Sequence, residues 1–396
     1  MRWFILAVLF TARTVMAFQF QTIGASGPAL VHDLGFRYSD VGTLIGLYLL
    51  PGVAIAFPGG LLGQRFGTRV ALGGLALMAI GGVITGTGLS LGAMSLGRLV
   101  SGTGGVLLNV LLAKMVADWF TDKSLTTAMG LLVTSWPLGV GAGLAGGHAI
   151  VAAYGWPALM DTGAALALAC LVLVAAVYRE PPGAPAAVAM DPKAAGLTPY
   201  EWRMTVVAGA IWAAYNVAFI VLISFAPGFF VARGFSPAQG SLVVSLLGWL
   251  LVPMIVAGGV LTARLGRPNL LMVTGFVGAA LATVAAPLTV APVALFVVIA
   301  LAAGLPAGPI MALPIQVLRP ESRATGMGVF FACYYAGMAV LPALAGWLRD
   351  HTGNATAPVY FAAVMMLCAL GLLGLFRALQ RDGQASSIPL PHHTKA

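Results

Sequence analysis

Charged residues are what this sequence has least of. Asp, Glu, Lys and Arg together make up 8% of the 396 residues, whereas 60% of residues are hydrophobic, and the mean hydropathy is +0.98. A water-soluble domain of this length needs a largely polar surface and would aggregate with so few charges. The composition therefore excludes a soluble globular fold and predicts an integral membrane protein.

Cysteine and the common catalytic motifs are also scarce. Cys170, Cys333 and Cys368 lie in three separate apolar runs, which is typical of small packing residues rather than of a disulfide framework. The sequence contains no His-Glu-x-x-His, no Gly-x-Ser-x-Gly and no phosphate-binding loop. We therefore predict no catalytic residue, no metal site and no cofactor, and we keep a membrane-embedded enzyme or sensor only as a minor alternative.

Long apolar runs, by contrast, occur twelve times, the first near residues 4–29 and the last near 358–377. Each run is long enough to cross the hydrocarbon layer of a bilayer, about 30 Å thick, as a helix. The runs are continuous rather than alternating, which favours helices over a membrane barrel. The sequence predicts an all-α integral membrane protein with twelve transmembrane helices.

The chain also repeats itself. A shift of 199 residues places Pro28–Leu72 on Pro227–Leu271 without a gap, and a shift of 198 places Thr127–Ala145 on Thr325–Ala343. A duplication in a membrane protein predicts two bundles that move about a shared site. We expect two six-helix bundles related as a parallel repeat, with these boundaries: N-terminal bundle 1–178, cytoplasmic linker 179–203, C-terminal bundle 204–378 and disordered cytoplasmic tail 379–396.

The distribution of Lys and Arg predicts the orientation. With the N-terminus in the cytoplasm, fourteen of these residues lie on the cytoplasmic side, and Arg37, Arg233 and Arg349 lie outside. The positive-inside rule therefore predicts a multi-pass protein of the cell membrane with both termini in the cytoplasm. No basic cluster interleaves with aromatic residues, which excludes a nucleic-acid partner. The expected partners are the lipid bilayer and a small-molecule substrate, and we expect a monomer.

A charged motif follows the second apolar run, and a partly matching copy of it occurs at 259–266. It reads Gly60-Leu-Leu-Gly-Gln64-Arg65-Phe-Gly67-Thr-Arg69. This pattern resembles the loop signature of the major facilitator superfamily, and with the twelve runs and the duplication the resemblance covers the whole chain. Gln64 and Ala263 stand where the family pattern has aspartate. The resemblance implies gating roles for Gly60, Gln64, Arg65, Gly67, Arg69, Arg264 and Gly266.

A narrower resemblance rests on two short motifs. Asp118-Trp119-Phe120, followed by Ser135-Trp136-Pro137, is similar to the cyanate and nitroimidazole transporter-like branch of the superfamily.

Two arginines, Arg13 and Arg98, lie deep in apolar runs, where each costs at least about 2.5–3.5 kcal/mol. The resemblance implies that helices one, four, seven and ten line a central cavity. The tenth run carries Gly304, Pro306, Gly308 and Pro309, whose freed backbone groups need a cavity or a neighbouring helix. The predicted substrate-cavity residues are Arg13, Gln21, Arg98, Asn109, Trp212, Tyr215 and Asn216. Two alternatives stay open: Arg98 ties helix four to backbone carbonyls, and the aromatic residues are ordinary packing.

The charge balance of the predicted cavity favours anions. Neither deep arginine has a carboxylate at similar depth, and a guanidinium suits planar oxyanions. The lack of a buried acid argues against cation binding and against a proton relay. We predict an alternating-access secondary transporter, not an enzyme, that moves a small organic or inorganic anion. The alternative is a proton-coupled efflux carrier for a hydrophobic compound, which the aromatic residues favour.

Overall fold

The computed structural model describes residues 1–55, 67–120, 124–180 and 196–385. Within these residues twelve helices are long and apolar enough to span a membrane, and no residue forms a strand, which confirms the predicted fold class. The first half contains α1 (Arg2–Leu34), α2 (Tyr38–Leu47, with its span continuing to Ile55), α4 (Thr68–Gly86), α5 (Leu91–Trp119), α6 (Leu125–Tyr154) and α7 (Trp156–Val177). The second contains α8 (Pro199–Ala232), α9 (Pro237–Leu265), α10 (Pro268–Ala285), α11 (Pro292–Gly304), α12 (Ala307–Ala312), α13 (Arg323–Thr352) and α14 (Ala357–Ala385).

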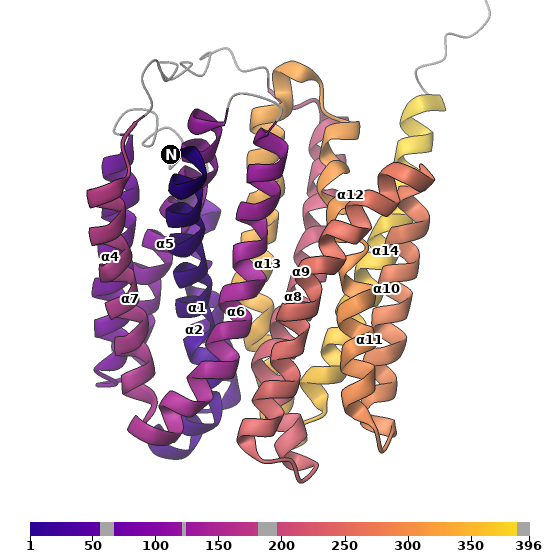
Figure 1. The fold of residues 1–396 in the computed structure, drawn as a ribbon. Helices are drawn as coiled ribbons and strands as arrows, with labels where there is room; N and C mark the ends of the chain where they lie inside the picture. Colours follow the sequence, from indigo (N-terminus) through magenta and orange to yellow (C-terminus); the bar gives the residue numbers. More distant parts are fainter. Residues whose placement is uncertain (56–66, 121–123, 181–195, 386–396) are drawn as a thin grey trace, which may run out of the picture.

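Apart from α2, the helices of each half pack mainly against one another. In the first half α1 contacts α6 and α7, and α4 contacts α5 and α7; in the second, α8 contacts α13 and α14. The start of α1 and the end of α14 lie at the same end of the molecule (Figure 1). We call this the inner end, after the predicted orientation, and the opposite end the outer end.

Local capping signals set where two helices of the second half begin. Thr198 and Glu201 form a capping box at the start of α8, and Ser236 and Gln239 form one at the start of α9. Such a box satisfies the free N–H groups of the first helical turn. Helix α8 therefore begins at Pro199, five residues before the start expected from hydropathy alone.

The sequence repeat is also a repeat of backbone conformation. Gly35 and Gly234, which a shift of 199 superimposes, have φ angles of 66° and 88°. The equivalent pair Gly67 and Gly266 have φ angles of 54° and 62°. Glycine adopts positive φ without a steric penalty, so each pair marks the same connection between helices in the two halves.

Among the described residues the two halves meet mainly along three helix pairs. Helix α2 packs against α13, α6 against α9, and α1 against α8. Because α9 is the repeat of α2 and α13 is the repeat of α6, the first two contacts are equivalent by the duplication. The side chains that matter for function lie around these contacts.

Candidate functional site

Arg13, on α1, donates hydrogen bonds to two neutral acceptors on neighbouring helices. Its Nε donates to Oδ1 of Asn109 on α5 at 3.0 Å, and its Nη1 donates to the carbonyl of Leu132 on α6 at 2.8 Å. Among the described residues Nη2 has no hydrogen-bond partner and no carboxylate pairs with the group. The half-buried guanidinium therefore keeps Nη2 free and its charge unpaired within this part of the chain.

The second half contributes tyrosines to the same place. Tyr334 and Tyr335 on α13 interact electrostatically with Arg13, and Tyr335 also hydrogen-bonds Asn109. At 1.5 Å per residue, Arg13 and Tyr335 both lie about 15–20 Å from the inner ends of their helices. The Arg13 site is thus at mid-depth and between the two halves.

Arg98 on α5 has a different environment. It is 1% exposed, and its Nε, Nη1 and Nη2 donate to the carbonyls of Leu44, Gln19 and Phe20 at 2.9, 3.1 and 3.0 Å. Its guanidinium carbon lies 4.5 Å from the ring centre of Tyr48. Every guanidinium nitrogen is used, so Arg98 ties α5 to α1 and α2, which is the structural alternative that the sequence left open.

The small and polar face of α5 around Arg98 also packs on α2. A β-carbon at Gly102 would meet the backbone of Tyr48, and one at Gly105 would meet the Tyr48 ring. Of this face, Asn109 is the member that reaches Arg13. The structure therefore brings Arg13 and Asn109 together and places Arg98 in a separate packing contact.

The predicted residues of α8 divide between packing and the Arg13 site. The Tyr215 hydroxyl donates to the Ala303 carbonyl at 2.7 Å, next to the end of α11, and the Asn216 amide donates to the Trp212 carbonyl at 2.8 Å. The half-buried Trp212 ring lies 6.2 Å from that of Tyr334. Trp212 thus faces the tyrosines near Arg13, whereas Tyr215 satisfies a carbonyl at the predicted break of the tenth span.

Gln21 lies further toward the outer end. It is 1% exposed, and neither side-chain amide atom has a hydrogen-bond partner among the described residues. The Gln21 amide and the Ser224 hydroxyl both lie against Gly24, between α1 and α8. Eight residues separate Gln21 from Arg13, a rise of about 12 Å, so the two are not neighbours in this structure.

Four of the seven residues predicted to act in gating lie in the described part of the chain. Gly60, Gln64 and Arg65 lie outside the described residues. Gly67 begins α4 and Gly266 ends α9, while Arg69 and Arg264 are exposed at the inner end. Their gating role stays a prediction.

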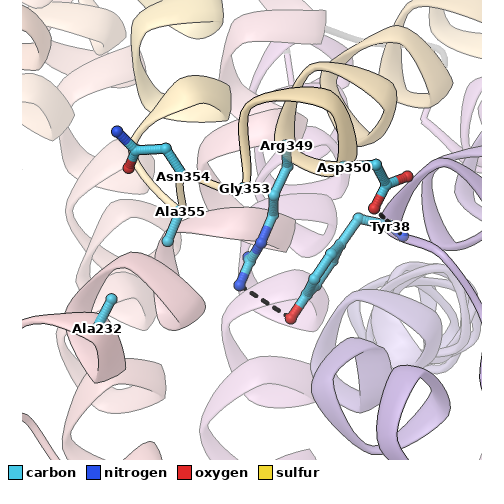
Figure 2. Close-up of a pocket in the computed structure, with 7 residues that line it drawn as sticks. All are labelled: Tyr38, Ala232, Arg349, Asp350, Gly353, Asn354 and Ala355. Carbon is cyan, nitrogen blue, oxygen red and sulfur yellow. Dashed lines mark hydrogen bonds between the residues drawn. The ribbon is translucent and has the colours of Figure 1, made fainter.

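Sequence reasoning missed a contact between the halves at the outer end. The carboxylate of Asp350 on α13 accepts hydrogen bonds from the backbone N–H groups of Tyr38 and Ser39, both at 2.8 Å, where α2 begins. Arg349 Nη2 donates to the Tyr38 hydroxyl at 2.9 Å, and its guanidinium carbon lies 3.5 Å from the centre of that ring (Figure 2). A carboxylate there satisfies free N–H groups and complements the helix dipole. We call this contact the outer latch.

Glycines bring the two backbones together beneath the outer latch. A β-carbon at Gly42 or Gly46 of α2 would meet the backbone of Pro342 or Ala339 on α13, and one at Gly346 would meet the carbonyl of Tyr38. Small residues permit this close approach of membrane helices. The halves are therefore closed against each other along the outer part of α2 and α13.

A buried acid at the inner end was also missed. Glu201 is 2% exposed and accepts from Arg319 Nε at 3.0 Å and from the Ser322 hydroxyl at 2.6 Å. The hydrogen bond and the charge of Glu201 raise the pKa of the exposed Arg319 guanidinium. Glu201 sits in what the sequence predicts as linker, so hydropathy gave no sign of its burial.

Sequence and structure comparisons identify the family. A sequence model described as the Major Facilitator Superfamily matches residues 9–233 and 204–394. The chain belongs to this superfamily and is a multi-pass membrane protein of a transporter family whose members carry small-molecule substrates. This confirms the resemblance found in the sequence; the narrower cyanate and nitroimidazole branch stays a prediction.

Individual relatives agree with the family at different levels. The "Major facilitator superfamily multidrug transporter mfsC" of Aspergillus fumigatus is 28% identical over 163 residues, which are 39% of this chain and 32% of that protein. The match thus spans about a third of that relative's length. A bacterial homologue of the human lysosomal transporter Spinster, inward-facing and occupied, superimposes with a TM-score of 0.74 at 18% identity, covering 96% of each chain. The inward-open xylose transporter XylE of E. coli gives 0.73 at 16% identity, covering 94% of this chain and 96% of that one. These structures share the fold.

Proposed function

We propose that this protein is an alternating-access secondary transporter that moves small anions across the membrane, with Arg13 as the anion-binding group. The observation that carries the proposal is the guanidinium of Arg13 at mid-depth between the halves. Two of its nitrogens are fixed by neutral acceptors and Nη2 is left without a partner among the described residues. A charge at this depth is costly, and a bound anion would supply the missing countercharge.

The contacts between the halves support an inward-facing arrangement. The outer latch and the glycine contacts close α2 against α13 on the outer side of the Arg13 site. In this state the substrate would exchange with the inner side. Access from outside would require Asp350 to release the start of α2, so that the two halves rock about the site.

Binding of small anions to the purified protein tests the role of Arg13. Nitrate, acetate and benzoate serve as probes, and affinity is measured by titration calorimetry in detergent. Arg13→Ala should cost about 2–5 kcal/mol of binding free energy for the anions that bind, as does truncation of one partner of a buried charge pair. Arg13→Lys should restore part of it, because it keeps the charge and loses the planar fork.

The matched control is Arg203→Ala, which removes an exposed arginine in the first turns of α8 at the inner end and should leave anion affinity unchanged. Unchanged affinity in a folded Arg13→Ala protein would reject the proposal.

A second candidate is proton-coupled efflux of a hydrophobic compound. Two observations favour it: the partial similarity to a protein named as a multidrug transporter, and the half-buried Trp212 beside Tyr334. It predicts that neutral or cationic compounds bind Arg13→Ala as tightly as the parent, and that a pH gradient drives their export from vesicles. Anion binding that depends on Arg13 would count against it.

A further inference from the structure

Aromatic side chains form a continuous cluster on α8 and α13 beside Arg13. Trp212 lies 6.5 Å from Phe330 and 6.2 Å from Tyr334, measured between ring centres. Tyr334 in turn lies 6.5 Å from Phe331 and 5.0 Å from Tyr335. We call these five residues the aromatic wall.

The aromatic wall and the cation belong to one surface. Asn109 contacts both, since it accepts from Arg13 and hydrogen-bonds Tyr335. Among the described residues the Tyr334 hydroxyl and the Trp212 indole N–H have no hydrogen-bond partner, although both side chains are half-buried. The site therefore combines a free guanidinium nitrogen, a free hydroxyl and the partly exposed rings of Trp212, Phe331 and Tyr334.

The guanidinium of Arg13 needs a negative charge, and the aromatic wall needs an apolar partner. One ligand can supply both. A small inorganic oxyanion would pair with Arg13 but leave the aromatic wall without a partner. A purely apolar compound would cover the wall but bury the charge of Arg13 unpaired, which is unfavourable. A carboxylate on a ring would accept hydrogen bonds from Arg13 and Tyr334, and its ring would stack on the wall in an offset or edge-to-face arrangement.

We infer that the substrates of this site are aromatic carboxylates. This inference rests on the proposed anion transport and narrows its substrate class: the charge selects a carboxylate, and the rings on α8 and α13 select the aromatic group attached to it.

Four probes separate the two components of recognition: benzoate, acetate, nitrate and the neutral benzamide. In the parent protein, benzoate should bind about tenfold tighter than acetate or nitrate, because only benzoate gains ring contacts. Benzamide should bind more weakly than benzoate by a similar factor, because it lacks the charge that pairs with Arg13.

Variants of the site then show which residues recognise the ring and which recognise the carboxylate. Trp212→Leu should weaken benzoate about fivefold or more and leave acetate within about twofold, whereas Trp212→Phe should keep most of the benzoate preference. Tyr334→Phe removes only the hydroxyl and should weaken benzoate and acetate by the same factor. Tyr360→Leu, an exposed aromatic position on α14, is the matched control and should change neither.

The possible failures are distinguishable. If benzoate, acetate and nitrate bind with equal affinity and all depend on Arg13, the aromatic inference is wrong and anion transport stands. If benzamide binds as tightly as benzoate and neither responds to Arg13→Ala, the anion proposal fails as well. If Trp212→Leu folds poorly, Trp212→Phe together with the probe series still decides the question.

Discussion

Arg13 and Arg98 both place a guanidinium group within the membrane domain, but their hydrogen-bond partners give them different roles. Arg98 donates from all three nitrogens to backbone carbonyls of α1 and α2. Arg13 donates from two and keeps the third free. The first arrangement stabilises the fold, and the second is suited to a ligand.

Replacing each arginine should therefore affect stability unequally. Arg98→Leu removes three hydrogen bonds from a charged donor, each worth about 1.5–3 kcal/mol, so we expect a large drop in the thermal unfolding midpoint in detergent. Arg98→Lys should recover part of the loss, because one ammonium replaces one or two of the bonds. Arg13→Leu, the comparison variant, removes two bonds from a half-buried group together with its unpaired charge, so its midpoint should fall less. Equal midpoints for Arg98→Leu and Arg13→Leu would show that the three bonds do not stabilise the fold.

The sequence shows which arginines are buried in the membrane domain, but it does not show which residues they bond. Both arginines are visible because a charge within an apolar run is conspicuous. The partners of Arg98 are carbonyls 54, 79 and 78 residues away, and every residue carries a carbonyl, so nothing in the sequence selects them. Asp350 was missed for the same reason, since it bonds backbone N–H groups more than 300 residues away.

At the scale of elements, hydropathy predicted all twelve spans, and local chemistry explains the details that hydropathy could not resolve. The tenth span breaks between α11 and α12, as its glycines and prolines suggested. Neighbouring helices cover the break: the Tyr215 hydroxyl bonds the Ala303 carbonyl, and Gly258 of α9 lies against the Leu305 carbonyl. The sequence indicated that a partner was needed, whereas which helix supplies it depends on the packed bundle.

The outer latch should bias the equilibrium between closed and open outer ends. Removing a helix cap costs about 0.5–2 kcal/mol, so Asp350→Ala should favour the open state by roughly 2- to 30-fold. The measurement is the labelling rate, from the outer side, of a cysteine at the buried Ser224 in protein lacking its three native cysteines. Labelling should be faster in Asp350→Ala.

A matched acid at the same end gives the control. Asp33 pairs with His32 and makes none of the described bonds across the halves, so Asp33→Ala should label at the parent rate. A latch variant that labels no faster than Asp33→Ala would show that the cap does not hold the outer end closed.

The close backbone contact between α2 and α13 offers a second test of the equilibrium between the closed and open outer ends. A β-carbon at Gly46 would meet the Ala339 carbonyl, whereas one at Gly73 of α4 meets nothing within 4 Å. Gly46→Ala should therefore hold the outer end open and slow transport in vesicles, and Gly73→Ala should not. Normal transport by Gly46→Ala would mean that the helices relax around the added carbon without losing closure.

At the scale of the whole molecule, the predicted orientation rests on fourteen basic residues on one side against three on the other. A cysteine at Thr68 should react with a membrane-impermeant reagent only from the cytoplasmic side. A cysteine at Asn354 should react only from the outside. The assay compares intact cells with inside-out vesicles, and labelling of Thr68→Cys in intact cells would reverse the orientation.

The duplication predicted the global architecture but not the state of the molecule. Repeat equivalence pairs the α2–α13 contact with the α6–α9 contact, and both exist in the structure. Which end is closed depends on a few bonds and close contacts at Tyr38, Gly46 and Asp350. Their free energies are small compared with those that set the fold, so composition and periodicity carry no information about them.

The two equivalent contacts between the halves are not equally secured, and this asymmetry sets an order of events. Val151 and Ala152 of α6 occupy the positions that Arg349 and Asp350 occupy on α13, and α9 begins with Pro237, which has no N–H to donate, where α2 begins with Tyr38. The α6–α9 seam therefore has no counterpart of the outer latch. We expect the α6–α9 seam to part first when the outer end opens, and the α2–α13 contact to part only after Asp350 has released the start of α2. Water entering from outside would then advance along this seam toward Trp249 of α9, which packs on Gly141 of α6.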